Sequence, residues 1–312
     1  MGRGSLVVAI VALLCAAGTA QAADPPLTTP PAKLAAALTC PSAFTHPARQ
    51  PVLLVHGTGL DANESWSWNY AKVLPAAGFD TCAVTLPDDA LGDIQVASEY
   101  VVYAIERVRA LSGRRVDVIT HSQGGMEGRW AVRWWARARR DVDDLVLLAS
   151  PNHGIAAADL CAGSGNCWPA VWQMATASHF LAALDRGDET PGALAVTNLY
   201  SRTDELVEPS TTVPLSGASN VAVQDVCPRP VHHGGLLDDA PTYALVLDAL
   251  THPGGADPAR IDPATCAQPF APGISAADAI AGNAMLYSDA AQAFSAHDGV
   301  PAEPPLKPYA RG

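Results

Sequence analysis

Charged residues are scarce in this sequence, and basic ones are the scarcer kind. Charged residues make up 16% of the 312 positions, and the formal net charge is −12. A chain this acidic lacks the basic surface with which proteins bind nucleic acid, and it has no electrostatic attraction to anionic membranes. We therefore expect no nucleic-acid partner and at most transient contact with a lipid interface.

Motifs for metals and nucleotide cofactors are also missing. There is no GxxxxGK phosphate-binding loop, and neither the C-x-x-C nor the H-x3-H spacing of common metal sites occurs. We therefore expect no metal and no cofactor. Apolar residues are abundant instead: they make up 49% of the chain, which is enough for a sizeable buried core.

The first 22 residues have the pattern of a secretory signal peptide. Arg3 is their only charge, the middle of the segment is apolar, and Ala20-Gln21-Ala22 fits a small-x-small cleavage site. The apolar run is shorter than the roughly 20 residues that span a membrane. We expect cleavage near Ala22 and a secreted, extracellular protein, in which a proline-rich leader at 23–37 precedes a catalytic domain at 38–312.

Cysteine usage fits an oxidising compartment. One of the seven cysteines lies in the expected signal peptide, which leaves an even number for the mature chain. Many pairings of six cysteines are possible and spacing alone does not choose among them, although Cys161 and Cys167 enclose only five residues and form a natural local pair. The six are Cys40, Cys82, Cys161, Cys167, Cys227 and Cys266.

Expected strands and helices alternate along the chain. Short apolar runs predict strands at 51–56, at 81–86, before Ser122, and at 145–149, 194–200 and 220–226. Helical periodicity predicts helices at 63–78, 93–111, 168–185, 241–251 and 275–296. Such alternation is typical of an α/β fold with a mostly parallel central sheet and helices on both faces. Ligands of such sheets bind beyond the carboxyl ends of the strands.

The most informative stretch is Val116-Asp117-Val118-Ile119-Thr120-His121-Ser122-Gln123-Gly124-Gly125. An apolar run ends in a small-residue turn, and a segment that can be helical follows. This is the order of the nucleophile elbow, G-x-S-x-G, whose strained turn exposes a serine hydroxyl above the sheet, although Thr120 replaces the first glycine. The N–H of Gln123 would then face a developing oxyanion at a helix N-terminus. An ordinary strand-to-helix turn is the alternative interpretation.

A serine nucleophile needs a base, and in α/β-hydrolases the base follows the serine and the acid along the chain. His232 and His233 lie in a loop after an expected strand and before a sheet-packing helix, where the base belongs. One member of this pair is expected to be an ordinary surface histidine. We interpret His153, which follows another strand end, as a wall or structural residue.

The acid and a second oxyanion donor also follow expected strands. Asp204 lies just beyond the strand at 194–200 and is the favoured acid, while Glu205 and Asp225 are alternatives that spacing does not exclude. The Gly57-Thr58-Gly59 turn after the first strand could supply backbone N–H groups, and the Thr58 hydroxyl, to an acyl oxygen.

Several further runs occur together with these motifs, namely PVLLVHGTG at 51–59, QVASEY at 95–100, THSQGG at 120–125, VWQ at 171–173, TNLYSRTDE at 197–205, VC at 226–227, HGG at 233–235 and PYAR at 308–311. With them the chain resembles lipase B of Candida antarctica and its bacterial relatives over roughly residues 38–310. The resemblance includes threonine in place of the first glycine of the elbow. It implies an α/β-hydrolase fold with a narrow acyl channel and little or no lid.

Carried over position by position, the resemblance implies a role for each matching residue. Ser122 would be the nucleophile, His233 the base and Asp204 the acid, and Thr58 and Gln123 would form the oxyanion hole. The resemblance also implies two disulfides and leaves the third pair, Cys161–Cys167, peculiar to this chain. The two implied disulfides are Cys40–Cys82 and Cys227–Cys266.

Departures from the family concern the substrate pocket. His121 stands where the best-known member has tryptophan, which makes the alcohol side more polar, while Met174 replaces glutamine and Asn152 replaces aspartate on the acyl side. Val171 and Leu206 keep apolar wall positions. The helix at 275–296, with Ile280, Met285 and Leu286, matches the helix at the channel mouth only loosely.

We expect a secreted, monomeric serine hydrolase that cleaves carboxylic ester bonds of lipids, a triacylglycerol lipase or esterase, through a Ser-His-Asp triad and an acyl-enzyme. A short-chain or polyester carboxylesterase without preference for lipid interfaces is the alternative among enzymes. It stays open because His121 is polar and because the segment at the channel mouth matches the family only loosely. A non-catalytic binding protein on a hydrolase fold is the alternative from another class. Loss of a triad residue would mark it, and all three are present.

Overall fold

The computed structural model describes Met1 and residues 23–311, so the expected signal peptide and its Cys15 lie outside the described residues. At its centre is a seven-stranded sheet in the order β1-β3-β2-β4-β5-β6-β7. The first strand pairs antiparallel with the third, and every other neighbouring pair is parallel. The strands are β1 (Leu38–Thr39), β2 (Val52–Val55), β3 (Thr81–Val84), β4 (Val116–His121), β5 (Val142–Leu148), β6 (Ala195–Tyr200) and β7 (Ser219–Ala222).

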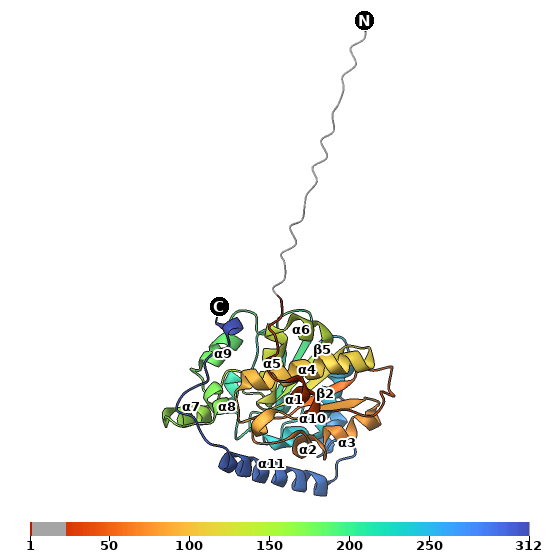
Figure 1. Ribbon diagram of the computed structural model, residues 1–312. Helices are drawn as coiled ribbons and strands as arrows, with labels where there is room; N and C mark the ends of the chain where they lie inside the picture. Colours follow the sequence, from red (N-terminus) through yellow and green to blue (C-terminus); the bar gives the residue numbers. More distant parts are fainter. Residues whose placement is uncertain (2–22, 312) are drawn as a thin grey trace.

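Helices connect the parallel strands and cover both faces of the sheet (Figure 1). They are α1 (Pro31–Ala36), α2 (Ala62–Trp66), α3 (Tyr70–Val73), α4 (Ile94–Ser112), α5 (Gly124–Trp134), α6 (Ala136–Asp141), α7 (Ala156–Gly163), α8 (Pro169–Gln173), α9 (His179–Leu184), α10 (Ala240–Thr251) and α11 (Ala276–Ala296). The predicted α/β class, with a mostly parallel sheet, is confirmed.

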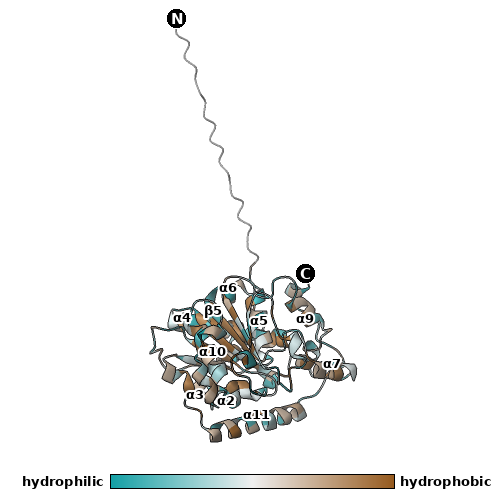
Figure 2. Ribbon diagram, turned by 180° about the vertical axis from the view of Figure 1, so that it is seen from behind, coloured by the Kyte–Doolittle hydropathy of each residue, from teal (hydrophilic) through white to brown (hydrophobic). Residues whose placement is uncertain are grey.

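Two hydrophobic clusters lie on opposite faces of the sheet. Successive strand residues point to opposite faces, so Leu53 and Val55 of β2 join one cluster while Val52 and Leu54 join the other. The first cluster holds side chains of α1 and α4 to α9, and the second holds side chains of α2, α3, α10 and α11. Hydrophobic colouring accordingly concentrates on the strands between the helical layers (Figure 2).

The long helix α4 forms where periodicity predicts it. The buried apolar residues Ile94, Ala97, Val101, Ala104 and Val108 recur every three or four positions. Asp93 caps the first turn by accepting a hydrogen bond from Gln95 N, and Gly113, with a φ of 73°, caps the end. The helices expected at 241–251 and 275–296 are also present, as α10 and α11. Among residues 23–311, no helix combines the length and the apolar character needed to cross a bilayer.

Three expected elements are wrong in extent. The helix expected at 63–78 is broken into α2, α3 and a short 3-10 turn, because the Asn69 side chain bonds both Ser65 O and Tyr70 N and turns the chain. The helix expected at 168–185 is divided into α8 and α9, the second of which begins at its own cap, Ser178. The strand expected at 220–226 ends at Ala222 and continues as a 3-10 turn.

The proline-rich leader lies against the sheet-covering helices. The backbone N–H groups of Thr28 and Thr29 and the Thr28 hydroxyl all donate to the Glu99 carboxylate, each at 2.7 Å. The Asp24 carboxylate accepts a hydrogen bond from Ala136 N at the start of α6, and Leu34 of α1 is buried in the first cluster. Contacts along its length therefore hold residues 24–36 to the rest of the described chain.

Candidate active site

Ser122 lies at the apex of a strained turn between β4 and α5. Its φ is 54°, in the left-handed region that non-glycine residues rarely adopt, and its N–H donates to Leu148 O at 2.8 Å. The turn requires small neighbours: a Cβ on Gly124 would lie 2.4 Å from His56 O, and one on Gly57 would lie 2.8 Å from the Ser122 Cβ. This geometry is that of a nucleophile elbow.

His233 and Asp204 form a buried hydrogen-bonded pair. The His233 Nδ1 lies 2.9 Å from Asp204 Oδ2, and the two residues are 5% and 4% exposed. Burial by itself would raise the pKa of Asp204, but the hydrogen bonds from His233, Val207 N and Leu206 N lower it. An ionised Asp204 therefore faces the imidazole and fixes the proton of His233 on Nδ1.

The structure distinguishes Asp204 from Glu205 and Asp225, the two alternative acids that spacing did not exclude. Asp225 pairs with Arg202 at 2.8 Å on the surface. Glu205 contacts the base loop, but it accepts a hydrogen bond from the backbone N–H of His233 rather than from its ring. His232, the other member of the histidine pair, is largely exposed beside Glu205. Among the described carboxylates, Asp204 is the one that bonds the His233 ring.

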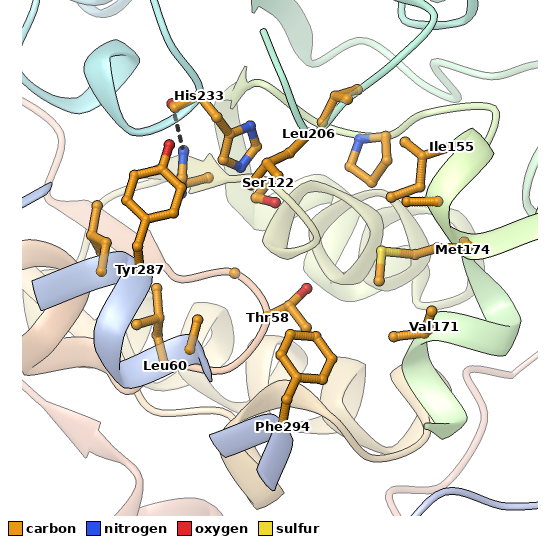
Figure 3. Close-up of a pocket in the computed structure, with 18 of the residues that line it drawn as sticks. Thr58, Leu60, Ser122, Ile155, Val171, Met174, Leu206, His233, Tyr287 and Phe294 are labelled. Atoms are coloured by element: carbon orange, nitrogen blue, oxygen red, sulfur yellow. Dashed lines mark hydrogen bonds between the residues drawn. The ribbon is translucent and has the colours of Figure 1, made fainter. Parts of the chain in front are cut away.

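Ser122, His233 and Thr58 line one cavity of about 330 Å³. In Figure 3 the Ser122 side chain lies next to the His233 ring, and Thr58 points towards the same space from the opposite side. The cavity is otherwise walled mostly by apolar side chains, among them Leu60, Ile155, Val171, Met174, Leu206, Leu286 and Phe294. Three of the predicted pocket residues, Val171, Met174 and Leu206, therefore line the same cavity as Ser122.

The expected oxyanion loop is held by a neutral histidine. His56 lies fully buried, with Nδ1 2.9 Å from Gly57 O and Nε2 accepting from Leu86 N at 2.8 Å. Burial lowers its pKa to about 4, so it stays uncharged near neutral pH. Thr58, in the same turn, donates its hydroxyl to Gln123 Oε1 at 2.6 Å, which links the turn to the N-terminus of α5.

His121, immediately before Ser122, also lines the cavity and is 3% exposed. Its Nε2 lies 3.3 Å from His233 O, and the centroids of the two rings are 4.7 Å apart. Burial, followed by the proximity of His233, lowers the pKa of His121 to about 3. His121 is therefore a neutral imidazole whose Nε2–H donates to the backbone of the base.

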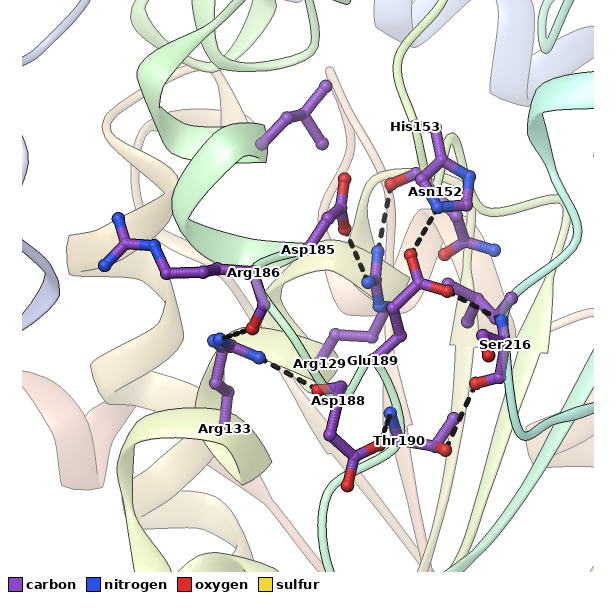
Figure 4. Close-up of polar contacts among 12 residues, drawn as sticks. Arg129, Arg133, Asn152, His153, Asp185, Arg186, Asp188, Glu189, Thr190 and Ser216 are labelled. Atoms are coloured by element: carbon purple, nitrogen blue, oxygen red, sulfur yellow. Dashed lines mark hydrogen bonds and ion pairs between the residues drawn. The ribbon is translucent and has the colours of Figure 1, made fainter.

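Asn152, the other predicted pocket residue, is not among the residues that line the cavity. Its side chain donates to Asn198 Oδ1 at 3.1 Å and to Val213 O at 2.8 Å, and its carbonyl accepts from Arg129 at 3.0 Å. Asn152 therefore belongs to the network of polar contacts in Figure 4. The prediction that it contacts substrate is therefore not supported by its position.

His153 belongs to the same network, as the structural interpretation expected. Its two ring nitrogens lie 2.6 Å from Thr212 O and from Glu189 Oε1, and the neighbouring Asp185 pairs with buried Arg129 at 2.7 Å (Figure 4). Ligand atoms of His153, Asp185 and Glu189 lie within 4.8 Å of one another, as do those of a second, acidic group in β4 and β5. Both groups lie outside the residues that line the cavity.

All six cysteines of the described chain form disulfides. The bonds are Cys40–Cys82, Cys161–Cys167 and Cys227–Cys266, which are the pairs expected from the resemblance and from local spacing. The Cys161–Cys167 bond joins the last turn of α7 to the segment that leads into α8, and Cys161 itself lines the cavity. This disulfide therefore stabilises one wall of the cavity.

Several cavity residues were missed by sequence reasoning. Tyr287, Ala290 and Phe294 of α11 line the cavity with Leu286, whereas Ile280 of the same helix is 72% exposed. The helical spacing of Leu286, Ala290 and Phe294 was the available signal, since residues four apart share one helix face.

The sheet order, the elbow serine and the buried histidine–aspartate pair define a class, the serine hydrolases of the α/β-hydrolase fold. A model of the family described as Lipase (class 2) matches residues 49–231. Lipase B of Pseudozyma antarctica is 32% identical over 297 residues, a match that covers 92% of this chain and 87% of that protein. The chain belongs to the class 2 lipase family, and the predicted family resemblance is confirmed.

Solved structures agree with this assignment. The crystal structure of Aspergillus fumigatus lipase B matches with a TM-score of 0.86 and 30% identity, covering 92% of this chain and 74% of that one. The mature form of the Bacillus licheniformis lipase BlEst2 matches with a TM-score of 0.52 and 19% identity over 59% of this chain and 87% of that one, which bears on the fold alone. The protein is thus a carboxylic ester hydrolase, a lipase or esterase acting on lipid or ester substrates.

Proposed function

We propose that Ser122, His233 and Asp204 are the catalytic triad of this hydrolase. The observation that carries the proposal is the buried His233–Asp204 pair, 2.9 Å apart, beside the cavity that Ser122 also lines. Because Nδ1 of His233 is engaged with Asp204, Nε2 is the nitrogen left to accept the serine proton. The strained φ of Ser122 supports the assignment, since such strain is typical of nucleophile elbows.

The proposed reaction has two halves. Ser122 Oγ attacks the ester carbonyl carbon while His233 Nε2 takes the hydroxyl proton, and the resulting tetrahedral oxyanion is stabilised by the backbone N–H groups of Thr58 and Gln123. Collapse of this intermediate breaks the bond to the alcohol, which leaves with the proton from His233. Water then attacks the acyl-enzyme by the same route and releases the acid.

We propose acyl chains of lipids as the occupants of the cavity. The walls formed by Val171, Met174, Leu206 and Phe294 are apolar, so longer acyl chains bury more hydrocarbon on binding. A short-chain or polyester esterase is the second candidate, favoured by the polar His121 beside the nucleophile.

Initial rates on p-nitrophenyl esters from acetate to palmitate test both points. We expect activity that persists on long chains in the wild type, remains in the exposed-site control Ser42→Ala, and falls by at least about a thousandfold in Ser122→Ala. Activity confined to short chains would move the assignment to the second candidate. Wild-type rates in Ser122→Ala would overturn the triad.

We further propose that residues 1–22 direct export and that the mature, extracellular protein is a monomer beginning near Ala23. Three disulfides within residues 23–311 support an oxidising destination. The contacts of Asp24 and Thr28 with α6 and α4 support cleavage before this segment, because they give the new N-terminus a docked position. Intact mass of protein collected from the medium should correspond to residues 23–312, whereas a mass that retains the first 22 residues would contradict cleavage.

A further inference from the structure

The backbone N–H and the backbone carbonyl of His233 each make a hydrogen bond to a side chain. Each of these two side chains belongs to a residue that is adjacent in sequence to another proposed triad residue. The N–H of His233 donates to Glu205 Oε2 at 3.0 Å, and Glu205 directly follows Asp204. Its carbonyl accepts from His121 Nε2 at 3.3 Å, and His121 directly precedes Ser122. Together with the bond to Asp204, these contacts engage the polar groups of His233 other than Nε2.

Glu205 is in turn oriented by the helix that borders the cavity. Its second oxygen, Oε1, accepts a hydrogen bond from the hydroxyl of Tyr287 in α11. Tyr287 is 43% exposed, and both its partial burial and the adjoining carboxylate raise the pKa of the phenol, so it remains the donor. Burial alone would raise the pKa of Glu205, but the bonds from Tyr287 and His233 N lower it, so the carboxylate remains an acceptor for both.

Helix α11 is fixed independently along its length. Lys72 pairs with Asp278 near its start at 2.8 Å, and Asn283 donates to Asp238 at 2.7 Å. The helix also packs directly against the base loop, because a Cβ on Gly234 would lie 2.2 Å from Asn283 Oδ1. Through Tyr287, Glu205 is therefore hydrogen-bonded to a helix that other contacts hold in place.

We infer that Glu205 is a positioning residue for His233 and that Tyr287 holds Glu205 in place, so that α11 sets the position of the base. The inference rests on the proposed triad. A displacement of the base relative to Ser122 lowers the rate of the chemical step, since misplacement of a reacting group by about 1 Å can cost about a hundredfold. Tyr287 also lines the cavity, so it links the helix that borders the substrate site to the position of the catalytic base.

The test compares kcat per active site in variants of the full mature chain, with active sites counted by phosphonate titration. On p-nitrophenyl acetate, Glu205→Ala is expected to lose about 10- to 100-fold in kcat with little change in KM, and Tyr287→Phe is expected to lose several-fold. Glu205→Gln should retain most activity, because its oxygen can accept from His233 N while its amide donates to the phenol oxygen. A merely structural role would lower Tm or the titrated fraction and leave kcat per site unchanged.

Ser288→Ala is the matched control, because it removes an exposed hydroxyl next to Tyr287 that bonds only Met285 O and Asp289 within α11. Its kcat per site should equal that of the wild type. Wild-type kcat per site in Tyr287→Phe would overturn the inference, and so would equal losses in Glu205→Gln and Glu205→Ala or in Ser288→Ala and Tyr287→Phe. Failure of the triad would appear differently, as an active Ser122→Ala variant.

Discussion

Glu127 is a fully buried carboxyl group in the first turn of α5, and the Gln123 side chain links it by hydrogen bonds to Thr58 of the proposed oxyanion loop. Its Oε1 accepts from the Gln123 side chain at 2.8 Å, and the same amide donates to Ala90 O at 2.8 Å. Burial raises the pKa of Glu127 to about 8, and the bond from Gln123 offsets this only in part. The folded protein therefore keeps Glu127 protonated at neutral pH, whereas the unfolded chain ionises it.

This difference predicts a pH-dependent effect of Glu127→Gln on stability. Because the pKa of Glu127 is raised on folding, its contribution to stability is full below about pH 4.5 and is lost as pH rises through about 8. The isosteric amide cannot ionise, so its Tm should rise relative to the wild type across this window and then level off. Each unit of pKa shift is worth about 1.4 kcal/mol, so the gain is on the order of a few kcal/mol.

Thermal unfolding at several pH values between 4 and 9 measures this effect. Asp298→Asn, at an exposed position, serves as the control and should follow the wild type throughout. A Tm difference between Glu127→Gln and wild type that does not change with pH would contradict the assignment of a buried, protonated carboxyl.

At the level of single residues, the sequence predicted site residues that belong to motifs but not contacts between residues far apart in the chain. Chain order and position after a strand favoured Ser122 and Asp204 and narrowed the base to His232 or His233, and the family resemblance then selected His233. The structure brings Ser122, Asp204 and His233 together at one end of the sheet. The Glu205–Tyr287 contact joins residues 82 positions apart that belong to no common sequence motif, so no local sequence pattern predicts this contact. Asn152 was placed at the substrate by resemblance, but its amide bonds Val213 O instead.

At the level of elements, buried periodic segments were predicted well and short capped ones were not. The helix α4 and the strands β2 and β4 carry long apolar patterns that tertiary packing reinforces. The segment at 63–78 has equally apolar residues, yet a side-chain bond from Asn69 to Ser65 O competes with the backbone ladder and ends α2 early. Whether a side chain makes such a bond depends on three-dimensional geometry, which hydrophobic periodicity does not predict.

The element that most shapes the cavity is α11. Its predicted extent, 275–296, agrees with the observed helix at Ala276–Ala296, and the Ser275–Asp278 capping box explains its start. The four-residue spacing of Leu286, Ala290 and Phe294 was a weak signal of the face that meets the cavity, because an alanine-rich helix has little amphipathic contrast. The structure assigns that face to Leu286, Tyr287, Ala290 and Phe294.

At the level of the whole molecule, the parallel sheet places all the proposed catalytic groups at one end. Ser122 follows β4, Asp204 follows β6, and Thr58 follows β2, so their positions are determined by the common direction of these strands. Family and fold were predictable because several motifs recur together in the same order. Substrate range was not, because it depends on how α7, α8 and α11 enclose the cavity.

The most direct test of the proposed triad is covalent labelling with an active-serine phosphonate followed by peptide mass spectrometry. The triad predicts one adduct, on the peptide that contains Ser122, with no adduct in Ser122→Ala and much slower labelling in His233→Ala. A label on another serine, or a label that persists in folded Ser122→Ala, would contradict the assignment of Ser122 as the nucleophile.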